Sequence, residues 1–574
     1  MVASKIPAHL TRQLFAAVLL IATISTALLF AQYMLATLFN TYDDEGYLLL
    51  SLVHYVRGGS LYRDTYSQHG PFYFCLQATL FSILRLQINH DTGRFVTLLY
   101  WITSALLAGR FVCRISHSIV LGAAAIICST FLAAVLANEP GHPQQVVLLL
   151  LAAASCLSLP GGFGLSSRGL LALGAIGAAL LLTKINVGVF YIAALGQTLL
   201  CLLPSGWFRT AGLRLSLAYA VAAPLLLMHA DLKGWARGYC LLAICCTTGT
   251  FVCGSLLKSG CRLAVPSLWY TFIGVFFGAA FTVTKTSLDG VSIRALIEGV
   301  ILDPLKHPRV FSLPLIVGTR RLLIALFIAG SIGAACLFRG RLGAYARWLD
   351  TVRFTFGIAA IVLLLYSPVY VVWLMPFLPL SLIPIADESW ELSERFPRLF
   401  IANLAATQFL QAYPVAGSQI SIGAVPMLLW AFVCIADGLG GVHGLLDEAS
   451  RVLVNALPKY ALSGTFLIIT VLFMMFLSGF RLLGYAYPSS GLRGSNSLHL
   501  PPEQASRYRF LASATNANCG VLFSLPGMGS FNFWSDVPAP NGWNLTAWVR
   551  AFDTANQDEI PRDPEIEPTS LRYI

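Results

Sequence analysis

Long apolar runs separated by short polar or basic segments make up most of the chain. Many of these runs approach the ~20 residues that a helix needs to cross a bilayer. Two apolar segments within residues 399–439 are joined by a turn with Pro and Gly, and they form either a helical hairpin or part of a soluble layer. We expect crossings at residues 14–38, 95–112, 120–136, 146–159, 170–182, 187–203, 213–228, 239–257, 268–283, 322–338, 354–366, 369–385 and 462–483.

This pattern predicts a mainly α, polytopic membrane protein of about 13 to 15 transmembrane helices. The transmembrane domain covers residues 1–488, with a first external loop at 40–94 and a second large external loop at 285–321. Two apolar segments of the first loop, 48–56 and the aromatic-rich 72–86, are expected to be interfacial helices rather than crossings. The first run is too long for a signal peptide, so it is expected to be a retained helix.

The C-terminal region changes composition and becomes polar and rich in Pro. A helix-like segment at 502–514 precedes a strand-like run at 519–524. We therefore expect a small external α/β domain at 489–556, followed by a disordered acidic tail at 557–574.

Composition supports the membrane class. Of the 574 residues 57% are hydrophobic and only 11% are charged, a balance foreign to soluble globular chains. The net charge of +11 comes from short Lys and Arg clusters between apolar runs, which fits the positive-inside rule and argues against a nucleic-acid partner. The 13 Cys lie mostly inside apolar segments, as small core residues do.

Alternating the crossings from a cytoplasmic start places the unusual polar motifs on one side of the membrane. Arg110, Arg114 and Arg168 then lie inside, as the positive-inside rule requires. The motifs at 139–144 and 183–186 lie outside, together with the acidic stretch in the first loop. This shared face predicts one external site.

The acidic stretch Asp43-Asp44-Glu45 directly follows the first apolar run. Carboxylates at a membrane surface are costly to desolvate, so such a cluster predicts proton transfer, sugar binding or a divalent cation held by oxygen ligands. The competing interpretation is a solvated acidic loop. The sequence leaves the metal unassigned.

The first external loop contains a series of motifs in a fixed order. They are the acidic pair before Gly46-Tyr47-Leu48, then Gly59 with Tyr62-Arg63-Asp64, and then Gly70-Pro71 before the aromatic segment. With the 182–188 and Glu139 motifs, this order resembles the GT-C fold glycosyltransferases, most of all the protein O-mannosyltransferase-like branch and related bacterial lipid A and cell-envelope sugar transferases. The resemblance covers about the first 200 residues well and the rest only in outline.

The resemblance implies an inverting transferase that moves a sugar from a polyprenyl-phosphate donor to a lipid, glycan or protein acceptor at the outer face. It requires no cofactor. In that reading Asp44 is the general base, with Glu45 beside it and Asp43 as the other candidate. The residues expected to bind the donor phosphate and substrates are Lys184, Arg63, Arg94, His69, Glu139, His142 and Tyr62.

Each assignment has an alternative. Lys184 can be an interfacial anchor, Arg63 can simply pair with Asp64, and Glu139 with His142 can belong to a polar turn between prolines. A lipid-linked glycan transporter or flippase, or a polysaccharide polymerase or ligase, are the alternative functions. The expected location is a bacterial inner membrane, with the site on the periplasmic or external face.

Overall fold

The computed structural model shows a mainly helical chain. It describes residues 8–65, 67–159, 165–256, 263–305, 312–338, 346–385, 390–449, 487–524 and 528–539. Within these ranges the structure contains helices and isolated β-bridges but no strand. The expected crossing at 462–483 and the tail at 557–574 lie outside the described residues.

The helices of the first half run from the N-terminus to α10. Their bounds are α1 Ala8–Thr37, α2 Asp44–Val56, α3 Pro71–Ile83, α4 His90–Ser116, α5 Ile119–Ala133, η1 Ala134–Asn138, α6 Pro143–Leu157, α7 Ser167–Leu181, α8 Ile185–Leu202, α9 Trp207–Leu227, η2 His229–Asp231 and α10 Ala236–Ser255.

The second half adds longer helices, several short turns and the two helices of the C-terminal region. Their bounds are α11 Ser267–Leu288, α12 Ile293–Ile297, η3 Glu298–Leu302, α14 Thr319–Leu337, α15 Ala346–Tyr366, η6 Pro368–Tyr370, α16 Val371–Leu374, η7 Met375–Ser381, α17 Leu382–Ile385, α18 Leu392–Gln408, η8 Phe409–Ala412, α19 Ser418–Ala449, α21 Pro502–Asn518 and α22 Ser530–Ser535.

Ten helices in the described part of the chain are long and apolar enough to cross a membrane, fewer than the 13 to 15 expected. The expected crossings at 146–159 and 170–182 correspond to α6 and α7, which have only 15 residues each. The expected crossing at 369–385 is broken into short helical pieces, because Pro376 and Pro379 cannot donate backbone hydrogen bonds. Helices also form at both loop segments, as α2 and α3.

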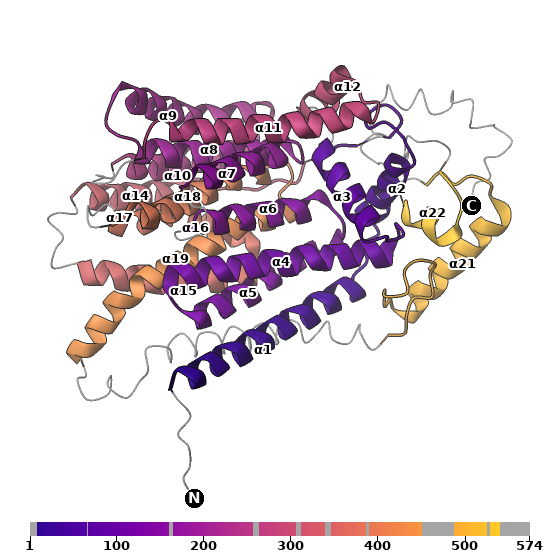
Figure 1. The fold of residues 1–574 in the computed structure, drawn as a ribbon, viewed down its shortest axis with the longest axis horizontal. Coiled ribbons are helices and arrows are strands. Elements are labelled where there is room, and N and C mark those ends of the chain that lie inside the picture. The colour runs from indigo at the N-terminus through magenta and orange to yellow at the C-terminus, as the bar shows by residue number, and fades with distance from the viewer. Residues whose placement is uncertain are drawn as a thin grey trace, which may run out of the picture.

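Helices α18 and α19 lie at the centre of the bundle. They form a helical hairpin around the 413–417 turn, which is one of the two alternatives for residues 399–439. Every residue of α18 from Arg395 to Gln408 is buried. Helix α15 packs along α19, α18 packs against α8, and α11 packs along α7. In Figure 1 the helices of the bundle run in broadly similar directions, with α2 and α3 at one end of it.

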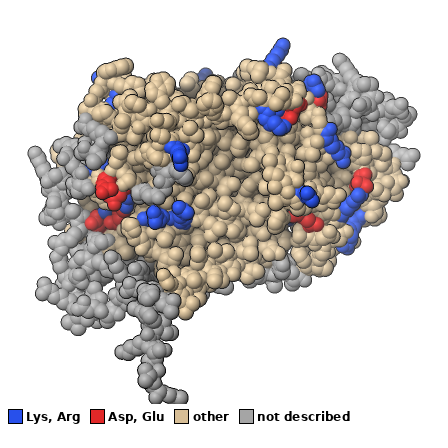
Figure 2. Space-filling view, viewed as in Figure 1, with Lys and Arg blue, Asp and Glu red and all other residues tan. Residues whose placement is uncertain are grey.

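Charged side chains are sparse on the face shown in Figure 2. They gather toward the two ends of the molecule and leave a broad central zone of uncharged residues. This distribution is typical of a protein whose middle faces hydrocarbon.

The C-terminal region lies at the same end of the bundle as α2 (Figure 1). Its described residues form helices α21 and α22, and an isolated bridge joins Ser489 to His499. The expected strand at 519–524 is wrong, because this segment pairs with no strand among the residues that the structure describes: Leu522 donates a single backbone bond to Pro538. The described part of the expected α/β domain is therefore helical.

Candidate functional site

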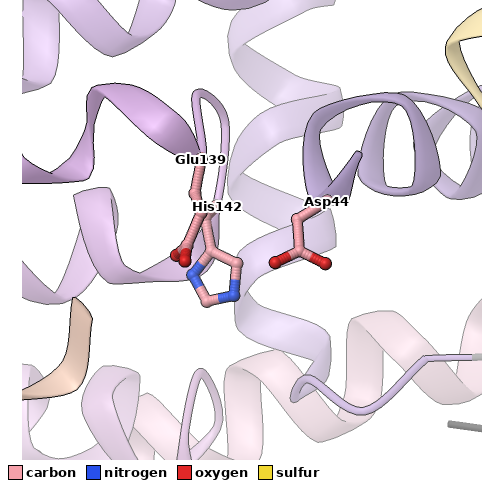
Figure 3. Close-up of side chains that lie close together, drawn as sticks. All are labelled: Asp44, Glu139 and His142. Carbon is pink, nitrogen blue, oxygen red and sulfur yellow. The ribbon is translucent and has the colours of Figure 1, made fainter. Parts of the chain in front are cut away.

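Three side chains converge where α2 meets the turn between η1 and α6. Each of Asp44, Glu139 and His142 offers a potential ligand atom, and these atoms all lie within 4.8 Å of one another. Figure 3 shows Asp44 pointing from the start of α2 toward Glu139 and His142 on the facing turn. The fold thus brings together residues almost 100 positions apart in the sequence.

The turn that carries Glu139 and His142 is held by three helices. Gly141, at a positive φ of 75°, donates its N–H to Thr97 of α4, and its carbonyl accepts a 2.6 Å bond from Tyr73 of α3. Gln145 of α6 donates to the carbonyl of Glu139 at 3.1 Å. These contacts fix the turn from both sides, so the positions of its side chains are set by packed helices rather than by the turn alone.

Lys184 completes the site from the turn before α8. It is partly buried as the N-cap of α8, and burial lowers its pKa to about 8, although the Glu139 carboxylate opposes that shift. The loop before α3 is tied to the same turn, because Gly70 donates to Thr183 at 3.0 Å and Phe72 donates to Leu182 at 2.9 Å. A Cβ on Gly70 would lie 2.0 Å from the Leu182 carbonyl oxygen, so only glycine permits this approach.

That loop also brings His69 to the site. Its ring meets the His142 ring edge to face at 5.0 Å between centroids. Tyr62 lies behind it and donates its hydroxyl to the His69 carbonyl at 2.8 Å. Tyr62 therefore supports the loop and shapes the site through His69.

Ser418 joins the site from the far half of the chain. Its hydroxyl, in the first turn of α19, donates to Glu139 at 3.0 Å. Sequence reasoning placed a turn with Pro and Gly within residues 399–439 but gave it no role at this site. The only available signal was a Ser-Gln pair ahead of a long apolar run, which marks a helix start and says nothing about a partner 279 positions away.

The electrostatics of the site are dominated by the two facing carboxylates. Burial raises the pKa of Asp44 well above its usual value, and the charges of Glu139 and Asp43 raise it further. Burial also raises the pKa of Glu139, opposed by the Ser418 hydrogen bond and by Lys184. Two carboxylates this close favour a shared proton or a cation between them. The raised pKa also means that Asp44, once ionised, is a stronger base than an ordinary aspartate.

The protonation of His142 helps to decide whether the site can hold a cation or a shared proton. Its Nδ1 accepts the backbone N–H of Gln144 at 3.2 Å and so caps α6. The neutral tautomer that accepts this bond carries its proton on Nε2, which makes Nε2 a hydrogen-bond donor instead of a metal ligand. Burial, His69 and Lys184 all lower the pKa of His142, so it stays neutral. As oriented, the three side chains fit a divalent cation poorly.

The other two carboxylates of the acidic stretch point elsewhere. Asp43 caps α2 by accepting from Gly46 at 3.0 Å, and it also accepts from Ser530 of the C-terminal region. Glu45 forms a bidentate ion pair with Arg94, with bonds of 2.8 and 2.6 Å, and both side chains are only 4% exposed. The three neighbouring carboxylates, at which the sequence left a divalent cation open as one possibility, therefore do not converge: the described groups beside Asp44 are Glu139 and His142.

Both arginines expected to bind the donor phosphate instead form ion pairs with carboxylates of the protein. Besides Glu45, Arg94 donates to the carbonyls of Leu35 and Leu38 at the end of α1, the latter at 3.0 Å. Arg63 pairs with its neighbour Asp64 at 2.8 Å on the surface, where the two side chains are 70% and 41% exposed. Lys184 is the expected cation that the structure places beside the carboxylates.

Comparison with known proteins gave no match. No family model, no curated protein and no solved structure matches the chain. The fold and the ten long apolar helices among its described residues define a mainly helical integral membrane protein.

The two arginine pairs lead to a prediction about stability. Arg94→Ala leaves the Glu45 carboxylate buried without its partner, which we expect to cost about 3–5 kcal/mol. Arg63→Ala removes an exposed pair and should cost less than about 1 kcal/mol. Thermal unfolding of the purified protein in detergent measures both. Equal, small shifts of the melting temperature for the two variants would contradict the structural role of the Arg94–Glu45 pair.

Proposed function

We propose that this protein is a membrane glycosyltransferase that moves a sugar from a polyprenyl-phosphate donor to an acceptor hydroxyl at the membrane surface. The observation that carries the proposal is the meeting of Asp44, Glu139 and Lys184 at one partly buried site. The resemblance of the first external loop to GT-C enzymes supplies the reaction class. The acceptor is a lipid, glycan or protein, and the proposed location is the external face of a bacterial inner membrane.

The first chemical requirement is a base. An acceptor hydroxyl becomes a good nucleophile only when a base within hydrogen-bond reach takes its proton. The raised pKa of Asp44 suits that task, because it makes the ionised carboxylate more basic than an exposed aspartate. Glu139, held by Ser418, lies opposite and helps to orient the incoming hydroxyl.

The second requirement is stabilisation of the leaving phosphate. As the acceptor oxygen forms its bond to the anomeric carbon, the bond from that carbon to the phosphate oxygen breaks, and the electron pair leaves with the lipid phosphate. The acceptor proton passes to Asp44. Lys184 supplies a fixed positive charge for the phosphate, and the Nε2–H of His142 supplies a donor.

Helix termini add to this favourable field. Five helices begin at the site, namely α2, α3, α6, α8 and α19. The N-terminus of a helix carries a partial positive charge and unpaired N–H groups, which favour anions. One lysine and these termini together suit a singly charged phosphodiester.

The base assignment is tested by an isosteric pair of variants. Asp44→Asn keeps the shape of the side chain but removes the base, so sugar transfer should fall by at least about 100-fold. Asp64→Asn makes the same change at an exposed position paired with Arg63 and should retain activity. The assay reconstitutes the purified protein in vesicles with polyprenyl-phosphate hexoses and pentoses and an envelope lipid extract. Full transfer by Asp44→Asn would overturn the assignment.

The phosphate role of Lys184 predicts a pH dependence. Because its pKa is lowered to about 8, the ammonium is present at pH 7 and is lost as the pH rises through 8. The apparent KM for the donor should therefore rise several-fold between pH 7 and 9, in line with the loss of one charge-assisted contact. Lys184→Arg keeps its charge throughout this range and should abolish the rise. An equal rise in both proteins would contradict the role.

A further inference from the structure

The residue next to the proposed base is held by the C-terminal region. Asp43 accepts a 2.7 Å bond from the backbone N–H of Ser530 and a 2.5 Å bond from its hydroxyl. Both residues are almost fully buried, with 1% and 0% exposure. Ser530, 487 positions away in the sequence, therefore binds the residue directly before Asp44.

His90 completes this contact as a third member. Its Nε2 lies 2.8 Å from the Ser530 hydroxyl oxygen. Because that hydroxyl donates its proton to Asp43, it accepts from His90, whose Nε2 therefore carries the proton. The His90 ring is fully buried and lies 5.6 Å from the Trp534 ring of the same C-terminal region. The resulting chain of buried hydrogen bonds joins α4, the start of α2 and α22.

The backbones of α2 and α22 also meet without side chains between them. A Cβ on Gly46 would lie 2.1 Å from the Ser530 nitrogen, and a Cβ on Gly529 would lie 2.8 Å from the Gly46 carbonyl carbon. Neither position has room for any other residue. This close approach fixes the first turn of α2 against α22.

Asp43 itself has a backbone conformation that needs such support. Its φ of 51° places it in the left-handed region, which an aspartate adopts at some cost in energy. The direction in which Asp44 leaves the chain depends on this conformation, because Asp44 is the first residue of α2. The bonds from Ser530 and Gly46 hold the Asp43 carboxylate in place and so stabilise the turn.

We propose that Ser530 is a positioning residue that acts through Asp43 to aim Asp44 at Glu139 and Lys184. The C-terminal region is then a working part of the active site, although it contributes no group to the chemistry. This inference rests on the proposed function, in which Asp44 is the base. The position of Asp44 that it predicts can be measured without an assay of sugar transfer.

The same region offers a matched control. Ser497 binds Asp91 as Ser530 binds Asp43, with a hydroxyl bond of 2.5 Å and a backbone N–H bond of 2.8 Å. This second contact also attaches the C-terminal region to the transmembrane bundle, but it lies at an exposed edge and does not involve the first turn of α2. Ser497→Ala therefore weakens attachment without disturbing Asp43.

The kinetic test compares Ser530→Ala, Asp43→Asn and Ser497→Ala in the full-length protein. Because a displaced base hinders the chemical step more than donor binding, Ser530→Ala and Asp43→Asn should lower kcat by about tenfold or more with little change in the donor KM. Ser497→Ala should leave both constants within about twofold of the wild type. Equal losses in Ser530→Ala and Ser497→Ala, or a raised KM with kcat unchanged, would overturn the proposal.

A cross-linking test separates this inference from the proposed function. In a protein with Asp44→Cys and Glu139→Cys, oxidation should join the two positions quickly, because the native side chains nearly meet. Adding Ser530→Ala should slow formation of that link at least several-fold, whereas adding Ser497→Ala should not. Peptide mass spectrometry identifies the link against the background of native cysteines. An unchanged rate with Ser530→Ala overturns the positioning role, even if wild-type protein transfers no sugar.

Discussion

The buried ion pair between Arg94 and Glu45 is the interaction on which the site depends. It joins α4 to α2, and the same guanidinium binds carbonyls at the end of α1. A charge pair this deeply buried contributes little net stability, but breaking it is costly because one charge is left unpaired. The pair therefore fixes α2 against α4, and in this position Asp44 faces the turn that carries Glu139.

A second set of contacts fixes the start of α2 from the side of Asp43. Asp43 binds Ser530 and Gly46, so the residues on either side of Asp44 are both anchored while Asp44 itself remains only partly buried. Two structural carboxylates thus hold the third, the proposed base, in position. Burial and the facing Glu139 then make Asp44 a stronger base than an exposed aspartate.

The sequence predicted much of this site and missed what depends on long-range contacts. Hydropathy and the positive-inside rule placed Asp44, Glu139 and Lys184 on one face, and the structure brings them together. Neighbouring residues at the start of a helix point about 100° apart, so Asp43, Asp44 and Glu45 reach different partners. No local pattern signals that Ser418 binds Glu139 or that Ser530 binds Asp43. The apolar runs likewise predicted helices at α6 and α7, but with 15 residues each these two are shorter than a typical membrane crossing.

The central claim is that this chain transfers a sugar at the Asp44 site. Mass spectrometry of envelope lipids and glycans tests it most directly, in cells that carry the wild-type protein, cells that lack it, and cells that carry Asp44→Asn. The account predicts that one sugar-bearing product present with the wild type is missing from both other samples, while the Asp44→Asn protein is still inserted in the membrane. Identical lipid and glycan profiles in all three samples would contradict it.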